Sequence, residues 1–133
     1  MNINSTLWRH YRDVYFFINR ELNLSQFAII TAWNPYSIKV SKEQNEKKNN
    51  ALEQKFNDFN YCKLLVGDLK RTWLEESFAV EMPQNLAIEL GKMVNQNAIY
   101  YVKNNQLYLI SCLENNGSEM IGTLSQKIVI QKN

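Results

Sequence analysis

Hydrophobic residues recur along the chain with two different periods, and their order predicts alternating β and α segments. In a strand, successive side chains point to opposite faces, whereas in a helix residues three and four apart share a face. Alternating or continuous apolar runs predict strands over residues 26–33, 61–66, 73–81, 97–102 and 106–112. The runs at 14–18 and 126–130 are weaker strand signals, and the first could instead continue a preceding helix.

Three segments carry helix signals. A short helix is predicted to begin at Ser5 or Thr6, either of which can cap it. Ser41 begins a longer helix, because Gln44 follows three residues later as a capping-box partner. A third helix follows Pro83, a residue that suits the first turn.

The order of these elements predicts an α+β fold in a single domain spanning residues 1–133. We expect a mostly antiparallel sheet of about five to six strands, with two main helices packed on it and a short N-terminal helix. Asn104-Asn105 predicts a tight hairpin, and Asn116-Gly117 predicts a turn in the tail. A chain of 133 residues with 45% hydrophobic and 12% aromatic residues is long and apolar enough for one core.

Composition argues against several classes of protein. The net charge is +2 and the basic residues are dispersed, so we do not expect a nucleic-acid partner. No apolar run approaches the roughly 20 residues of a membrane span, and no signal-peptide pattern opens the chain, so we expect a cytoplasmic protein. Cys62 and Cys112 are expected to be buried thiols rather than a disulfide. Neither cysteine belongs to a metal-spaced pair and His10 is the only histidine, so we expect no metal site. We also expect no cofactor.

Short connections between the predicted elements bring the unusual polar residues to one rim of the sheet. If the strand over 26–33 runs upward, its end meets the start of the next helix, and each later segment reverses direction. The segments that meet at this rim are 31–35, 41–45, 70–71, 73–77 and 96–97.

One carboxylate stands out in the strand over 73–81. The alternation places Glu76 in the same row as Leu74 and Phe78, and an acid that points into a core is costly unless it is paired or neutral. Glu76 is therefore our candidate general acid or base, with a pKa raised by desolvation. The alternative is a structural carboxylate that pairs with Arg71 or accepts backbone N–H bonds in the loop. Glu75 on the opposite face is expected to be solvated.

Aromatic and amide side chains at the same rim complete the candidate site. The tryptophans could stack a flat ligand or close the core, and the amides could bind a polar ligand or tie loops together. No histidine neighbours the serine, so a Ser/His triad is not expected. The candidate ligand-binding residues are Trp33, Asn34, Asn45, Arg71, Trp73, Ser77, Gln96 and Asn97.

Several motifs together resemble one uncharacterised bacterial family, domain-of-unknown-function family 3293. The resemblance covers roughly residues 7–112 as a family-like core and leaves 113–133 as a C-terminal extension. In that family the helix motif reads Glu-Asn with Arg-Asn, whereas this chain has Gln44 and Lys48 at the charged positions. Many relatives have glycine where this chain has Asn95. The motifs that carry the resemblance are Thr31–Pro35, Gln44-Asn45, Lys48-Asn49, Leu52, Trp73–Phe78, Leu90-Gly91 and Gln96–Ile99.

The family supplies no activity, so two hypotheses for the function stand. In the first, a polar pocket at the rim binds, or acts on, a compact polar or nucleotide-like ligand. In the second, the protein is an interaction module, such as an accessory or host-defence-related inhibitor, and works through its surface without catalysis. The sequence leaves open whether the protein is an enzyme.

Overall fold

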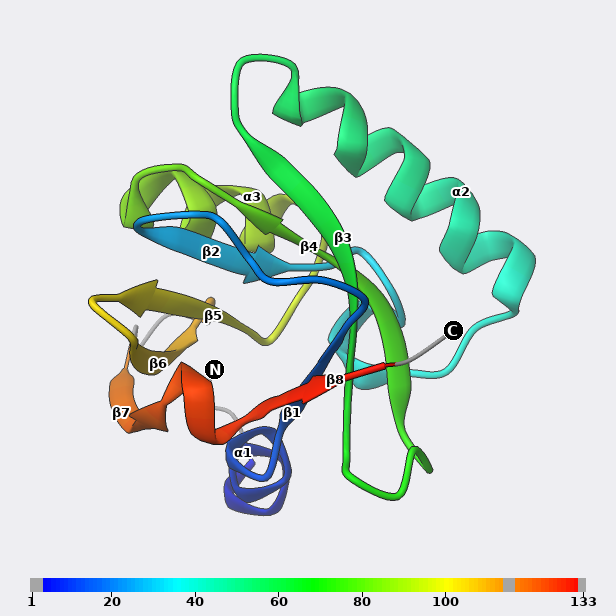
Figure 1. Cartoon of the computed structure of the whole chain (residues 1–133). Helices are drawn as coiled ribbons and strands as arrows, with labels where there is room; N and C mark the ends of the chain where they lie inside the picture. Colours follow the sequence, from blue (N-terminus) through cyan, green and yellow to red (C-terminus); the bar gives the residue numbers. More distant parts are fainter. Residues whose placement is uncertain (1–3, 114–116, 132–133) are drawn as a thin grey trace.

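The computed structural model describes residues 4–113 and 117–131, and in it eight strands form one curled, mixed sheet (Figure 1). The strand order is β7-β6-β5-β2-β4-β3-β1-β8. Neighbouring strands are antiparallel, except that β1 and β8 run parallel. The helices and strands are α1 (Ser5–Arg12), β1 (Tyr15–Ile18), β2 (Phe27–Ile30), η1 (Pro35–Ser37), α2 (Lys42–Glu53), η2 (Gln54–Phe56), β3 (Tyr61–Gly67), β4 (Leu74–Val80), α3 (Gln84–Met93), β5 (Ala98–Lys103), β6 (Gln106–Ser111), β7 (Ser118–Thr123), η3 (Leu124–Gln126) and β8 (Ile128–Ile130).

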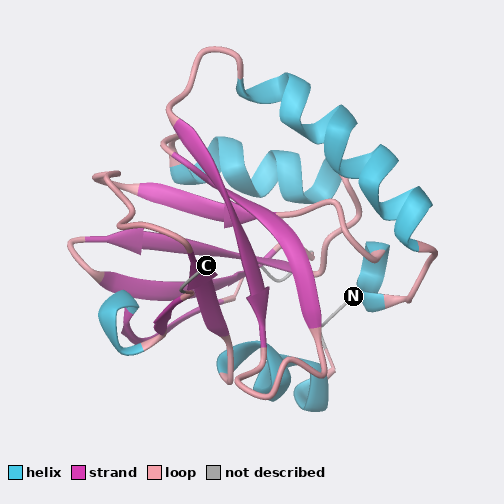
Figure 2. Cartoon of the chain, turned by 45° about the vertical axis from the view of Figure 1, so that its right-hand side comes forward, coloured by secondary structure: helices cyan, strands magenta, loops and turns pink. Residues whose placement is uncertain are grey.

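The curl gives the sheet two buried faces and therefore two hydrophobic clusters. On the convex face, Phe78 and Val80 of β4 pack with Leu52 and Leu90 from α2 and α3. On the concave face, side chains from strands across the sheet meet one another, as Phe16 and Tyr100 do edge to face at 5.3 Å between ring centroids. α2 and α3 lie on one side of the sheet and α1 lies at one end of the curl (Figures 1 and 2).

The α+β class and the helix signals are confirmed, but the expected number of strands is wrong. Both weak runs are strands, namely β1 and β8, and β7 has no counterpart among the predicted segments. β7 is an edge strand whose residues are all exposed or half-buried, so it shows no run of buried apolar positions for the sequence to reveal. The expected C-terminal extension thus supplies both edge strands of the sheet.

Local signals placed most of the turns and caps correctly. Ser41 and Gln44 form the expected capping box of α2. Asn104 and Asn105 take positive φ values of 50° and 65° in the β5–β6 hairpin, as the pair predicted. α1 is capped by Asn4 rather than by Ser5 or Thr6, since the Asn4 side chain accepts from two backbone N–H groups. The turn expected at Asn116-Gly117 begins outside the described residues.

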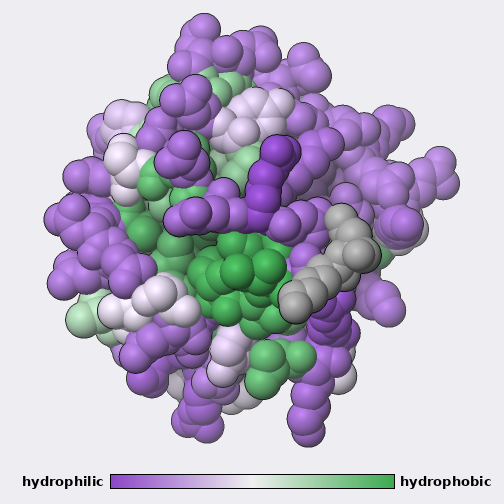
Figure 3. Space-filling view, viewed as in Figure 1, coloured by the Kyte–Doolittle hydropathy of each residue, from purple (hydrophilic) through white to green (hydrophobic). Residues whose placement is uncertain are grey.

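Hydrophilic side chains cover most of the surface seen in Figure 3, around one hydrophobic patch at the centre of that view. Both cysteines are free thiols, and Cys112 is buried. None of the helices among the described residues has the length and apolar character needed to cross a membrane.

Gly67 sets the geometry of the β3–β4 hairpin, which leads into the candidate site. It is paired with Leu74, and a Cβ atom at Gly67 would lie 2.0 Å from the backbone oxygen of Trp73. The backbone oxygen cannot move without shifting the strand, so only glycine allows this close approach. The hairpin in turn fixes where β4 begins.

We predict that Gly67→Ala destabilises the protein by roughly 1–3 kcal/mol or more, because the added methyl group overpacks against backbone. The measurement is the free energy of unfolding in urea. Gly117→Ala is the matched control, since a Cβ atom there meets nothing within 4 Å. Equal stability of the two variants would contradict this account of the hairpin.

Candidate functional site

The structure brings the predicted polar segments together at one rim of the sheet. The loop after β2, the start of α2, the β3–β4 turn and the segment before β5 meet at the end of the curl that α1 covers (Figure 1). All eight predicted ligand-binding residues line one of two adjoining hollows there. The structure adds Tyr11 of α1 and Ser37 of η1, which line both hollows.

The two hollows are an inner cavity and an outer groove. The inner cavity has a volume of about 40 Å³, room for only a few atoms. The outer groove has a volume of about 520 Å³, within the usual range of small-molecule sites. Tyr11, Ser37, Trp73 and Glu75 line both hollows and therefore mark the passage between them.

The acid at this site is Glu75, so the predicted burial of Glu76 and the predicted solvation of Glu75 are both wrong. The Glu76 side chain is exposed, on the side of the sheet that α2 covers. Glu75 is half-buried and points to the concave side, where it lines the cavity and the groove. The structural pairing of Glu76 with Arg71 also fails, because the Arg71 guanidinium lies elsewhere.

The side chains of β4 alternate between two faces as predicted, but the face that carries Glu75 is more buried at this point than the face that carries Glu76. Ser77 and Ala79 look weakly hydrophobic in sequence, yet they are 3% and 0% exposed because the curl packs other strands against them. Phe78 is covered by Phe56 at 5.2 Å between ring centroids, but that cover ends before Glu76. The concave face, where strands pack closely against one another, therefore carries small residues in β4, and Glu75 lies on the same face.

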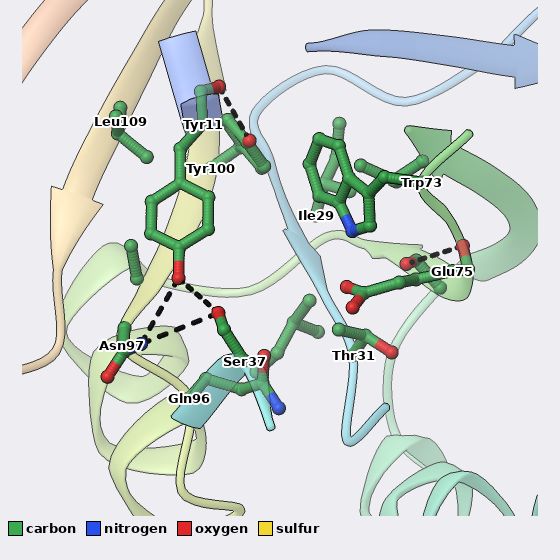
Figure 4. A pocket seen from close by; sticks show the side chains of 14 residues that line it. Tyr11, Ile29, Thr31, Ser37, Trp73, Glu75, Gln96, Asn97, Tyr100 and Leu109 are labelled. Carbon is green, nitrogen blue, oxygen red and sulfur yellow. Dashed lines mark hydrogen bonds between the residues drawn. The ribbon is translucent and has the colours of Figure 1, made fainter. Parts of the chain in front are cut away.

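The Glu75 carboxyl is held by two neutral donors. Nδ2 of Asn34 donates to Oε2 at 3.3 Å, and the indole nitrogen of Trp73 points at the same carboxyl (Figure 4). Among residues 4–113 and 117–131, Glu75 forms no salt bridge. Burial raises the pKa of Glu75 from its ordinary 4.5 to about 7, since the two hydrogen bonds offset only part of the desolvation.

Hydroxyl and amide groups form the opposite wall of the inner cavity (Figure 4). The hydroxyls of Tyr11 and Ser37 are hydrogen-bonded to each other, and Asn97 Nδ2 donates to the Tyr11 oxygen at 3.1 Å. The Tyr100 hydroxyl donates to the Tyr11 carbonyl at 2.8 Å, which fixes the end of α1 over the cavity. Burial, with a smaller contribution from the charge of Glu75, raises the pKa of Tyr100.

Two of the predicted amides hold the loop after β2 in place. Asn34 and Asn45 form a reciprocal pair, in which Asn45 Oδ1 accepts from the Asn34 backbone at 2.8 Å and Asn45 Nδ2 donates to Asn34 Oδ1 at 2.9 Å. Gln96 Nε2 donates to the Trp33 carbonyl at 3.1 Å. These contacts favour the loop-tying alternative for Asn45, which is 2% exposed, while Asn34 also reaches Glu75.

Asn49, which the sequence placed only in the family motif, makes the corresponding link between β2 and β4. Its Oδ1 accepts from the backbone of Ala32 at 2.7 Å, and its Nδ2 donates to the Glu76 carbonyl at 2.8 Å. The same carbonyl accepts from the Thr31 hydroxyl at 2.7 Å. α2 thus keeps the two strands that flank the cavity in register.

Arg71 and the two tryptophans among the predicted ligand-binding residues each contact a different part of the protein. The guanidinium of Arg71 lies over the Phe17 ring at 4.5 Å and donates to Gln131 Oε1 at 2.9 Å, so it is directed towards β1 and the C-terminal segment. The Trp73 ring lies 4.9 Å from the His10 ring, centroid to centroid. Trp33 lines only the outer groove.

Backbone strain accumulates around the groove. Asn34, Tyr36, Ser37 and Arg71 have φ values of 47°, 55°, 62° and 60°, a left-handed region that residues other than glycine rarely adopt. Each such residue costs of order 1 kcal/mol or more, and strain of this kind clusters at functional sites. The strain therefore supports a binding role for this rim.

Some site residues were not predicted. Tyr11 belongs to the predicted first helix, but nothing in the local sequence shows that this helix lies over the rim. Ser37 sits in a turn whose positive φ values carry no glycine signal in the sequence. Among the described residues, no group of three or more His, Cys, Asp or Glu side chains could hold a metal ion.

Together these features define an α+β domain with a small-molecule-sized groove at one end of a curled sheet. The sequence model of a family described as protein of unknown function (DUF3293) matches residues 30–99, more than half of the chain, and the protein belongs to this family. The matched segment contains Trp33, Asn34, Glu75 and Gln96. No curated protein and no solved structure matches the chain.

We predict that Asn49→Ala lowers the free energy of unfolding by about 1–3 kcal/mol, because it leaves the buried Ala32 N–H without its acceptor. Asn50→Ala on the exposed side of the same helix is the control, since it gains the same helix propensity without losing a buried contact. Urea unfolding monitored by tryptophan fluorescence measures both. Equal losses in the two variants would show that Asn49 is not the link described here.

We predict that Glu75 makes stability depend on pH between about 4.5 and 7. The raised pKa means that the folded state holds the proton more tightly, so stability falls as pH rises through this window and the loss is complete above pH 7. At about 1.4 kcal/mol per pKa unit, the loss is about 3 kcal/mol. Glu75→Gln removes this dependence and should be more stable than the wild type at pH 8.

The experiment is urea unfolding at several pH values from 4.5 to 8 for the wild type and two variants. Glu76→Gln is the matched control, because it removes the neighbouring exposed acid. The difference in stability between Glu75→Gln and the wild type should grow with pH, and that for Glu76→Gln should stay flat. Parallel behaviour of the two variants would show that Glu75 is solvated.

Proposed function

We propose that this protein binds a compact polar ligand in the outer groove, with one polar group of the ligand entering the inner cavity beside Glu75. The observation that supports this most directly is the position of Glu75, a desolvated carboxyl at the junction of the two hollows. Desolvating an acid costs stability, and proteins retain such groups mainly where they act. The strained loop and the amide ties hold the groups around it in fixed positions.

The same carboxyl has the properties of a general acid or base. A pKa of about 7 keeps both protonation states populated at neutral pH, which is where proton transfer is most efficient. Glu75 therefore takes the role that the sequence suggested for Glu76. The Tyr11, Ser37 and Asn97 side chains face it across the cavity and can orient a reacting group.

The test is a thermal-shift screen of amino acids, sugars, nucleotides and small carboxylic acids against the wild type, followed by titration of each hit. We expect at least one compound to raise Tm, and Glu75→Gln to weaken its binding at least about tenfold, because a hydrogen bond to a charged group contributes about 1.5–3 kcal/mol. Glu76→Gln should bind like the wild type.

Two outcomes would overturn the proposal: no compound raises Tm, or Glu75→Gln binds every hit as the wild type does. The first outcome would favour the protein-interaction hypothesis. That hypothesis has support from side chains next to the groove, since Tyr36 and Ile38 are 50% and 65% exposed. Exposed aromatic and aliphatic residues of this kind serve as anchors in protein interfaces.

A further inference from the structure

We propose that the ligand is zwitterionic: a nitrogen cation, an ammonium or amidinium group, enters the inner cavity against Glu75, and an anionic group lies in the outer groove. This inference rests on the proposed function and names the class of ligand. It follows from three features of the site. Glu75 has no countercharge, hydrogen-bond acceptors face the inner cavity, and lysine side chains line the groove.

The first feature is the missing countercharge of Glu75. Its donors are an amide and an indole N–H, which are neutral, and in the part of the chain that the structure describes it has no salt-bridge partner. A desolvated carboxylate gains most from a cation that brings both charge and hydrogen-bond donors.

The second feature is the orientation of the amides around the inner cavity. Gln96 donates its Nε2 to the Trp33 carbonyl, which turns its side-chain oxygen towards the space between Ser37 and Thr31 (Figure 4). Asn97 donates its Nδ2 to Tyr11. The Gln96 side-chain oxygen and the Glu75 carboxyl are therefore acceptors that face the cavity, and a ligand group rich in N–H donors satisfies both.

The third feature is the opposite charge of the outer groove. Lys39 and Lys42 line the groove, and among the described lining residues Glu75, at the inner end, is the only acid. Lys42 is partly neutralised by Glu46 at 3.7 Å, whereas Lys39 forms no ion pair within the described residues. An anionic group of the ligand is attracted by the lysines of the outer groove and repelled by Glu75 at the inner end.

The sizes of the two hollows agree with this division. A volume of about 40 Å³ has room for a head group of a few atoms, which suits a terminal ammonium or amidinium group. The groove of about 520 Å³ can hold the rest of a compact molecule. Amino acids and short ω-amino or ω-guanidino acids combine these properties.

The experiment compares matched probes by isothermal titration calorimetry at about pH 6. The zwitterions are the standard amino acids, 4-aminobutanoate and 4-guanidinobutanoate, while butanoate and butylamine each keep only one charge. We expect at least one zwitterion to bind about tenfold or more tightly than either single-charge probe. Its binding should release a proton, because a cation stabilises the ionised form of Glu75, and the release is measured from two buffers with different ionisation enthalpies.

Two variants separate the ends of the site. Glu75→Gln should abolish the proton release and weaken the zwitterion about tenfold or more, and Glu76→Gln should change neither. Lys39→Gln should weaken the zwitterion several-fold and leave butylamine binding unchanged. Retention of full zwitterion affinity in Glu75→Gln would overturn the inference.

The outcomes also separate this inference from the proposed function. If sugars, nucleotides or anions bind in a Glu75-dependent way and no zwitterion does, the ligand class is wrong and the binding function stands. Proton uptake instead of release on binding would likewise show that the inner group is not a cation. If no compound in either panel binds, both proposals fail together.

Discussion

The curl of the sheet is the constraint on which the rest of this structure depends. Because the sheet bends, the central strands are buried on both faces, and one face packs against other strands rather than against helices. Such a face needs small side chains where strands approach closely, as Ser77 and Ala79 show. The open end of the curl must then be covered, and α1, the loop after β2 and the β3–β4 turn cover it incompletely. The cavity and the groove are what this incomplete closure leaves.

Polar hydrogen bonds, rather than apolar packing, hold in place the loop after β2 that helps to cover the open end of the sheet. Asn45 and Asn49 are buried on a helix that is otherwise mostly polar, and their amides bind the backbone and side chain of the neighbouring loop and strand. Amides suit this task because each offers donors and an acceptor in one plane. These links explain how the loop can keep left-handed residues such as Tyr36, whose conformation would otherwise relax.

The electrostatics of the rim follow from the same geometry. Glu75 lies where the curl excludes water, so its charge is costly, while the lysines of the neighbouring loop and helix start lie at the solvated mouth. The site therefore has an acidic group at its inner end and basic groups at its mouth, within the size of a small molecule. An extended ligand with opposite charges at its ends matches that arrangement better than a ligand of one sign.

The sequence by itself determined the elements that local chemistry controls: the capping box at Ser41, the asparagine hairpin and the strand β2. It also determined the family membership. It also determined which segments meet at the rim, because short connections leave few paths for the chain. It did not determine the edge strand β7, whose exposure removes the hydrophobic pattern, or the place of Tyr11, which depends on where α1 packs. Above all, it could not decide between Glu75 and Glu76. Alternation fixes that the two point to opposite faces, but which face loses its water depends on the curl, and the curl is a property of all the strands together.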